Sequence, residues 1–128
     1  MFGKSWNKKQ TGDTAEILAR DYLCAQGLAL LDNNVRFKGG EIDLIMQDQS
    51  SLIFVEVRYR RHNRFGSGAE TVTITKQRHI IQAANLYLQK HPELAKMPAR
   101  FDVVSISSDT SPAQTQIDWI QNAFQVEE

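Results

Sequence analysis

The stretch that decides the fold runs from Gly40 to Tyr59 and reads GEIDLIMQDQSSLIFVEVRY. Residues 41–47 and 52–59 are rich in apolar and β-branched side chains, and the four polar residues between them are typical of a turn. The stretch therefore predicts a β-hairpin with its loop at 48–51. Counting back from a Gln47–Leu52 pair places Asp43 directly opposite Glu56.

In this register, strand alternation places the side chains of Asp43, Glu56 and Arg58 on one face. The other face would be wholly apolar, with Ile42, Leu44, Met46, Ile53, Val55 and Val57. Side chains that face each other across a strand pair have Cβ atoms about 4.5–5.5 Å apart. Two carboxylates at that distance repel each other unless a positive charge joins them.

A divalent cation would supply that charge. Mg²⁺ takes oxygen ligands, often one or two carboxylates together with a substrate phosphate. Such a site would neutralise a phosphodiester and activate water, and Arg58 would hold the phosphate or stabilise its charge in the transition state. The same register places Glu41 opposite Arg58, so a ladder of structural ion pairs on a solvent-facing sheet gives the same pattern. The pattern alone leaves both alternatives open.

Outward from the hairpin, the apolar spacing predicts two helices, from about residue 11 or 13 to 26 and from about 75 to 90. A short strand at 28–31, a turn at 32–34 and an extended segment at 35–37 precede the hairpin. A further strand covers 100–107, and a segment of undecided type covers 117–126. This order predicts an α/β fold in which helices pack on a mixed sheet.

Length and composition predict one globular domain. The chain has 128 residues, 41% of them hydrophobic and 23% charged, and residues 1–10 look like a loose lead-in. No apolar run approaches the ~20 residues that cross a bilayer, and the first residues lack the apolar core of a secretory signal. The single cysteine, Cys24, cannot form an internal disulfide. We expect a cytoplasmic protein without a membrane partner.

The formal net charge is zero, but the charges are unevenly distributed. Residues 58–78 contain six Lys or Arg and one Glu, whereas residues 101–128 contain five acidic residues and no Lys or Arg. A neutral chain with this distribution can present one basic face to nucleic acid. The alternative is a set of solvated surface arginines, which is the commoner origin of a charge run.

Residues 40–45 (GEIDLI) and 54–58 (FVEVR) resemble the signature of the PD-(D/E)XK nuclease superfamily. Within it, the sequence is most similar to the small bacterial YraN-type proteins, relatives of archaeal Holliday-junction resolvases. The likeness extends from residue 11 to residue 104, about three quarters of the chain. It implies a restriction-endonuclease-like fold, a mixed sheet flanked by helices, and a metal-dependent DNA endonuclease that is either structure-selective, with branched DNA as a candidate substrate, or nonspecific.

The resemblance also implies a set of site residues. Asp43 and Glu56 would bind Mg²⁺ or Mn²⁺, with the Val57 backbone carbonyl as a third ligand and Glu16 as an additional acid. An ion pair of Glu16 with Arg20 at i+4 is an equal alternative for that residue. Gln77 continues the inward stripe of the second helix and would point at the site, unless it is only a polar residue of the first turn.

Arg58 departs from the superfamily pattern, which usually has lysine at this position. Arginine keeps its proton, so Arg58 cannot act as a base and would contribute by charge alone. If the proton chemistry of lysine is required, the protein would be a nucleic-acid-binding module that does not cut. A third alternative is an adaptor whose basic loop binds an acidic protein.

The basic segment that leaves the second strand of the hairpin starts at the predicted site. Its arginines would bind phosphates in a salt-dependent, sequence-independent way, and Tyr59 or Phe65 could stack on bases. The expected nucleic-acid contacts are Arg58, Tyr59, Arg60, Arg61, Arg64, Lys76 and Arg78. The resemblance to resolvases also implies that the protein could form a homodimer, although no dimer interface can be identified from the sequence.

Overall fold

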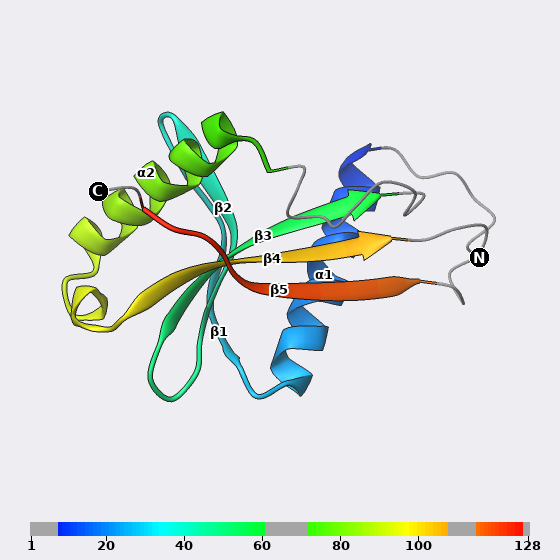
Figure 1. The fold of residues 1–128 in the computed structure, drawn as a ribbon, viewed down its shortest axis with the longest axis horizontal. Helices are drawn as coiled ribbons and strands as arrows, with labels where there is room; N and C mark the ends of the chain where they lie inside the picture. Colours follow the sequence, from blue (N-terminus) through cyan, green and yellow to red (C-terminus); the bar gives the residue numbers. More distant parts are fainter. Residues whose placement is uncertain (1–7, 61–71, 108–114, 127–128) are drawn as a thin grey trace.

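The computed structural model describes residues 8–60, 72–107 and 115–126. The elements in chain order are α1 (Lys8–Ala25), β1 (Ala29–Phe37), β2 (Gly40–Gln47), β3 (Leu52–Arg60), α2 (Ile74–Lys90), the short 3₁₀ helix η2 (Leu94–Lys96), β4 (Ala99–Ser107) and β5 (Gln116–Phe124) (Figure 1). The five strands form one sheet in the order β1-β2-β3-β4-β5. This arrangement confirms the predicted mixed α/β fold and is consistent with a restriction-endonuclease-like fold.

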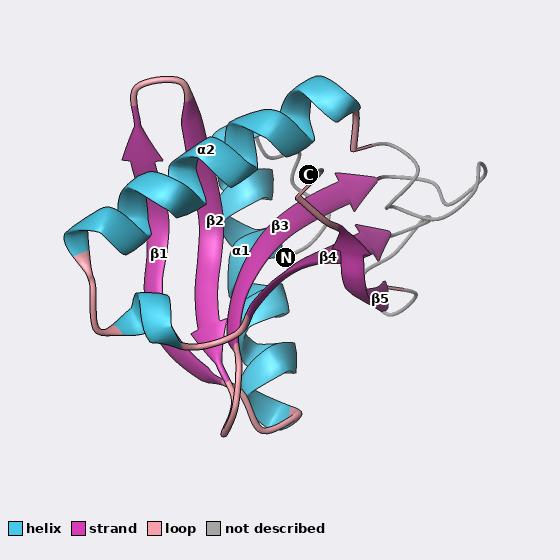
Figure 2. Cartoon of the chain, turned by 60° about the vertical axis from the view of Figure 1, so that its left-hand side comes forward, coloured by secondary structure: helices cyan, strands magenta, loops and turns pink. Residues whose placement is uncertain are grey.

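Only one neighbouring pair of strands, β3 and β4, is parallel. A parallel pair needs a long crossover between its strands, and the crossover here contains α2. The two helices consequently lie on opposite faces of the sheet, α2 on one and α1 on the other (Figure 2). The sheet is the middle layer of three.

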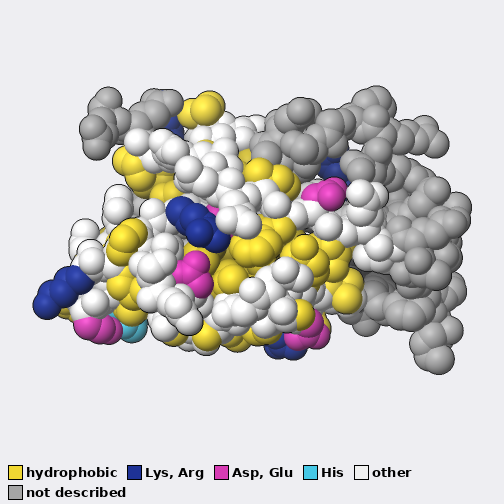
Figure 3. Space-filling view, turned by 60° about the horizontal axis from the view of Figure 1, so that its bottom comes forward, with side chains coloured by type: hydrophobic (Ala, Val, Ile, Leu, Met, Phe, Trp, Pro, Cys, Tyr) yellow, Lys and Arg dark blue, Asp and Glu magenta, His cyan; other side chains and the backbone are white. Residues whose placement is uncertain are grey.

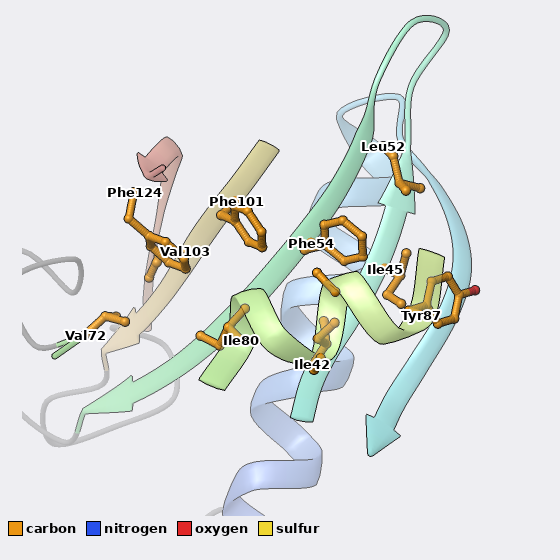
Figure 4. Close-up of a cluster of buried hydrophobic side chains, with 12 residues drawn as sticks. Ile42, Ile45, Leu52, Phe54, Val72, Ile80, Tyr87, Phe101, Val103 and Phe124 are labelled. Atoms are coloured by element: carbon orange, nitrogen blue, oxygen red, sulfur yellow. The ribbon is translucent and has the colours of Figure 1, made fainter. Parts of the chain in front are cut away.

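Each face of the sheet has its own apolar core. On the α2 side, Ile80, Ala83 and Tyr87 pack on sheet residues that include Ile42, Ile45, Phe54, Phe101, Val103 and Phe124 (Figure 4). On the α1 side, Ala15, Ala19 and Leu23 pack on Leu44, Met46, Ile53, Val55, Val104 and Ile106. Because β3 and β4 are covered on both faces, consecutive residues such as Leu52–Val55 in β3 are apolar and buried.

The predicted hairpin and its register are confirmed. β2 and β3 pair from Leu44↔Val55 to Gln47↔Leu52. The Asp48 carboxylate closes the turn, because its Oδ1 accepts hydrogen bonds from the backbone N–H groups of Ser50 at 2.9 Å and Ser51 at 2.7 Å. An aspartate at the first turn position commonly makes such bonds, which explains why the turn was legible in the sequence.

The strand alternation is interrupted at Asp43. Ile42 packs in the α2-side core, whereas Leu44, two residues further, packs in the α1-side core. The prediction that Ile42 shares a face with Leu44 and Met46 was therefore wrong. The physical reason is that the Asp43 side chain turns toward β3, where its Oδ2 accepts a hydrogen bond from the Val57 backbone N–H at 2.8 Å.

The predicted turn at 32–34 was also wrong, because β1 continues through it. The strand accommodates the polar residues by a register shift between Leu30 and Asp32 and by a positive φ of 51° at Asn34. Asparagine tolerates this left-handed conformation better than most residues. Asn34 lies between the pairs Asn33↔Leu44 and Val35↔Ile42, and so opposite Asp43. The irregularities in β1 and β2 therefore lie opposite each other, at Asn34 and Asp43.

The remaining predictions concern element ends. The helix predicted at about 75–90 and the strand predicted at 100–107 are confirmed within one residue as α2 and β4. The first helix begins at Lys8, earlier than predicted, and the undecided segment 117–126 is largely the strand β5. One face of the molecule carries hydrophobic side chains between scattered charged ones, and no cluster of described Lys and Arg gathers on it (Figure 3).

Candidate metal centre

Asp43 and Glu56 meet where β2 and β3 separate. The strand pairing stops at Leu44↔Val55, one position before the two acids. Their carboxyl groups are within hydrogen-bonding reach of each other. The Glu56 side chain is only 4% exposed. The predicted juxtaposition of the two acids is therefore present, although their strands no longer pair there.

Both carboxyl groups resist ionisation. Burial is the largest cause for each, and it raises the pKa of Asp43 above its usual range. Burial and then the charge of Asp43 raise the pKa of Glu56 to about 8. The pair therefore retains one proton at neutral pH, as closely spaced carboxylates do when no cation neutralises them. A divalent cation at this position would replace that proton.

Two cationic side chains approach the pair without neutralising it fully. The Glu56 Oε2 lies 3.8 Å from Arg58 Nη1 and 3.8 Å from Lys76 Nζ. These distances exceed the about 2.7–2.9 Å of a charge-assisted hydrogen bond. Glu41, the expected cross-strand partner of Arg58, instead lies 3.3 Å from Arg36 Nε. The predicted alternative of a Glu41–Arg58 ladder is thus not the arrangement observed.

The acids open into a cavity of about 210 Å³ between the two helices and the separated strands. α1, β2, β3 and α2 all contribute to its wall, with Gly12, Ala15, Glu16, Glu41, Asp43, Glu56, Val57, Tyr59 and Lys76. Four of these residues are acidic and one is a lysine. The wall therefore favours a cation over an anion.

Glu16 lies in this wall, where the resemblance places an additional acid. Burial and the nearby charge of Asp43 raise its pKa to about 6, and the Asn34 side chain donates a hydrogen bond to it. Arg20, its alternative partner, donates to Asp21 at 3.0 Å. Across residues 8–60, 72–107 and 115–126, no three Asp, Glu, His or Cys converge tightly enough to hold a metal ion together. Glu16 is thus a neighbour of the acid pair and does not complete a three-carboxylate cluster.

Val57 contributes its backbone to the same space. Its N–H bonds to Asp43, and the N–H and C=O of one strand residue project from the same edge. Because the pairing with β2 has already ended, the Val57 carbonyl faces the gap between the strands. Carboxylate and carbonyl oxygens are the donor set that Mg²⁺ and Mn²⁺ prefer. The residues present therefore fit such an ion.

Residues 15–106 match the model of the uncharacterised protein family UPF0102. The chain belongs to this family. It is 50% identical over 119 residues to the UPF0102 protein of Saccharophagus degradans, covering 93% of this chain and 96% of the relative. It is 47% identical over 118 residues to the UPF0102 protein of Stutzerimonas stutzeri, covering 91% and 96%. The UPF0102 protein of Coxiella burnetii is 50% identical over 119 residues, covering 93% and 95%.

In this UPF0102 protein, α2 brings Lys76 to the acids, whereas Gln77 lies elsewhere. The Gln77 side-chain amide donates to the Val72 carbonyl at 3.0 Å and lines a separate groove with Ile81 and Val126. The helical spacing of Lys76, Ile80 and Ala83 is the signal that could have identified Lys76, because the latter two are buried against the sheet. The resemblance matched both Lys76 and Gln77 to polar residues at the start of the family's second helix, but only Gln77 was expected at the site, and Lys76 was assigned to nucleic-acid binding.

The other predicted nucleic-acid contacts divide into three groups. Arg58 and Tyr59 lie at the acid pair, where Tyr59 lines the cavity and is 41% exposed. Arg60 ends β3, and Arg78 is exposed on α2 beside the groove that contains Gln77. Arg61 and Arg64 lie outside the described residues, as does Phe65.

Asp102 is a buried acid of the UPF0102 chain with a structural role. It is fully buried and accepts hydrogen bonds from Arg100 Nε at 3.0 Å, Trp119 Nε1 at 2.8 Å and the Asn122 N–H at 2.8 Å. The bonds from Trp119 and Asn122 join β4 to β5.

None of the described helices is long and apolar enough to span a membrane.

Proposed function

We propose that this UPF0102 protein is a metal-dependent nuclease of the PD-(D/E)XK type that hydrolyses phosphodiester bonds in DNA. One observation carries the proposal. The side chains of Asp43 and Glu56 come together at the point where two strands separate, in a cavity with a fitting oxygen donor set. Paired carboxylates with raised pKa values in a cavity are typical of functional sites.

The Asp43 and Glu56 carboxylates and the Val57 carbonyl would hold Mg²⁺ or Mn²⁺. When bound, the ion neutralises phosphate charge and activates water. Glu16, on the cavity wall, would orient water or accept a proton, since its raised pKa of about 6 suits proton exchange near neutral pH.

The basic side chains would serve the substrate. Arg58 is always protonated and would stabilise the phosphate by charge alone. Tyr59 is exposed beside the acids and would stack on a base near the bond that is cut. Arg60, Arg61, Arg64, Lys76 and Arg78 complete the proposed DNA contacts. The resemblance to resolvases favours branched DNA as the substrate. It also favours a homodimer as the form of the protein that cuts it.

The test is cleavage of four-way junction, linear duplex and single-stranded DNA with Mg²⁺ or Mn²⁺ and with EDTA. We expect cleavage that requires the metal and that falls by about 10³-fold or more in Asp43→Asn and Glu56→Gln, because each removes a ligand charge. Glu93→Gln, the same change at an exposed acid in the η2 region, is the matched control and should cleave normally.

The departure at Arg58 favours one second candidate, a nucleic-acid-binding module that does not cut. DNA binding with a steep salt dependence, without cleavage in either metal, would establish that candidate instead. If the protein binds no DNA at low salt, both proposals are wrong and a protein-binding adaptor remains.

A further inference from the structure

Two cations lie at the same distance from the Glu56 carboxylate, but they come from different elements. Arg58 is on β3, in the position of the superfamily lysine, and Lys76 is on the first turn of α2. Both Nη1 of Arg58 and Nζ of Lys76 are 3.8 Å from the same oxygen, Glu56 Oε2. Neither makes a short hydrogen bond to that oxygen, so both side chains can turn to another anion.

Lys76 is the cation that belongs to the cavity. In the described part of the chain, it contributes to the cavity wall beside Glu16, Asp43 and Glu56. Its side chain is 33% exposed, so that the ammonium group borders both the acids and the solvent. A phosphate that enters the cavity would meet this group at the mouth.

The backbone of Lys76 is held firmly. Thr73 caps α2, and its Oγ1 accepts a hydrogen bond from the Lys76 N–H at 3.1 Å. The Gln77 N–H donates to the Thr73 carbonyl at 2.8 Å, and the Gln77 side chain ties the same turn to Val72. The point from which the side chain extends is therefore fixed at the cavity, while the ammonium group itself can turn.

The occupant of Glu56 decides where Lys76 points. Without a metal, Lys76 Nζ lies 3.8 Å from Glu56 Oε2, at the edge of the singly charged acid pair. A divalent cation held by the oxygens of Asp43 and Glu56 would repel the ammonium group of Lys76. The phosphate of a bound substrate would then be an anion to which this side chain could turn.

From this geometry we infer that Lys76 is a catalytic residue, which contacts the scissile phosphate and supplies from α2 the ammonium group that β3 lacks. This inference rests on the proposed nuclease function and deepens it. The ligand is a phosphodiester, and Lys76 acts as a fixed positive charge. In the metal-free protein the same ammonium group lies 3.8 Å from Glu56 Oε2, beside an acid pair that carries a single negative charge.

The test separates the chemical step from binding. Lys76→Met should lower the single-turnover cleavage rate at saturating DNA by about 10²–10³-fold, the typical effect of removing one transition-state charge contact. Its DNA affinity in Ca²⁺, measured without cleavage, should fall by about tenfold or less, as for one phosphate contact. Lys96→Met in η2 is the matched control for loss of one exposed lysine and should change neither quantity.

A chemical rescue guards against a folding defect. Lys76→Cys in a Cys24→Ser background, alkylated with 2-bromoethylamine, regains an ammonium group at nearly the same reach. Cys24 is exposed and would otherwise react as well. We expect the alkylated protein to recover most of the lost rate, with an unfolding temperature equal to that of the unmodified variant.

A second readout does not depend on cleavage. Removing the competing ammonium group should tighten Mn²⁺ binding by about threefold to tenfold in Lys76→Met, as measured by calorimetry. If Lys76→Met keeps the wild-type rate at saturating DNA, or loses DNA affinity alone, the inference is wrong although the nuclease stands. If the wild-type protein cuts no DNA with either metal, the nuclease proposal fails and the inference fails with it.

Discussion

At the scale of single residues, the candidate site is defined by two neighbouring carboxyl groups that the fold keeps buried, which is energetically unfavourable. Glu56 is almost fully buried beside Asp43, and both acids would be more stable in water. Such strain is common where binding of a ligand relieves it. The buried Asp102, by contrast, has three donors around it and needs no ion.

This strain predicts how the stability of the metal-free protein depends on pH. The folded-state pKa of Glu56 is about 8 and its ordinary value is 4.5, and the pKa values of Asp43 and Glu16 are raised too. A raised carboxyl pKa means that folding favours the protonated form, so stability is greatest below about pH 4.5 for these groups. It falls as the pH rises toward 8, by a few kcal/mol in total.

Thermal unfolding in EDTA between pH 5 and pH 9 measures this effect. We expect a lower unfolding temperature at the alkaline end, and a much smaller decline in Glu56→Gln, which cannot ionise at that position. Mn²⁺ should restore the wild-type stability at alkaline pH, because it replaces the lost proton. An unfolding temperature that rises steadily from pH 5 to pH 8 in EDTA would contradict the raised pKa values.

At the scale of elements, the site depends on how closely α2 approaches the beginning of β2. Gly40 makes this approach possible, since a Cβ at this position would overlap the carbonyl oxygen of His79. His79 is one turn beyond Lys76 on the same helix. The glycine therefore sets the distance between the lysine and the acids.

Gly40→Ala should move α2 away from the sheet and slow cleavage without removing a functional group. Overpacking of this kind costs about 1–3 kcal/mol of stability. The matched control is Gly12→Ala on α1, where a new Cβ meets nothing within 4 Å. That change should raise stability by about 0.5–1 kcal/mol, because alanine favours a helix. Chemical denaturation of both variants measures the difference, and equal stabilities would contradict the role of Gly40.

The elements also show what the sequence could predict. The hairpin was predictable because its turn chemistry and its apolar pattern are local, and its register brought Asp43 and Glu56 together. The irregularity at Asp43 was not predictable, because it depends on a hydrogen bond to the Val57 N–H in another strand. Gln77 was expected at the site, but Lys76 lies there instead. The Gln77 side chain is directed away by its hydrogen bond to the Val72 carbonyl, which helical spacing does not reveal.

At the scale of the whole molecule, a net charge of zero coexists with two cationic side chains at the edge of an acidic cavity. The formal charges cancel over 128 residues, yet Arg58 and Lys76 stand together beside the acids. Attraction of the whole protein to DNA should therefore be weak, and binding should depend on a few phosphate contacts near the site. The acidic cavity itself repels a phosphate until a divalent ion occupies it.

DNA affinity at several salt concentrations tests this distribution of charge. In Ca²⁺, the logarithm of the affinity should fall linearly with the logarithm of the salt concentration, and Arg58→Met and Lys76→Met should each reduce the slope by about one. Lys96→Met should leave the slope unchanged, since this lysine lies in η2 and outside the cavity wall. Binding should also be stronger in Ca²⁺ than in EDTA, because the ion cancels the repulsion between the cavity acids and the phosphate. Equal slopes in all variants, with equal binding in EDTA, would place the DNA on a different surface of the molecule.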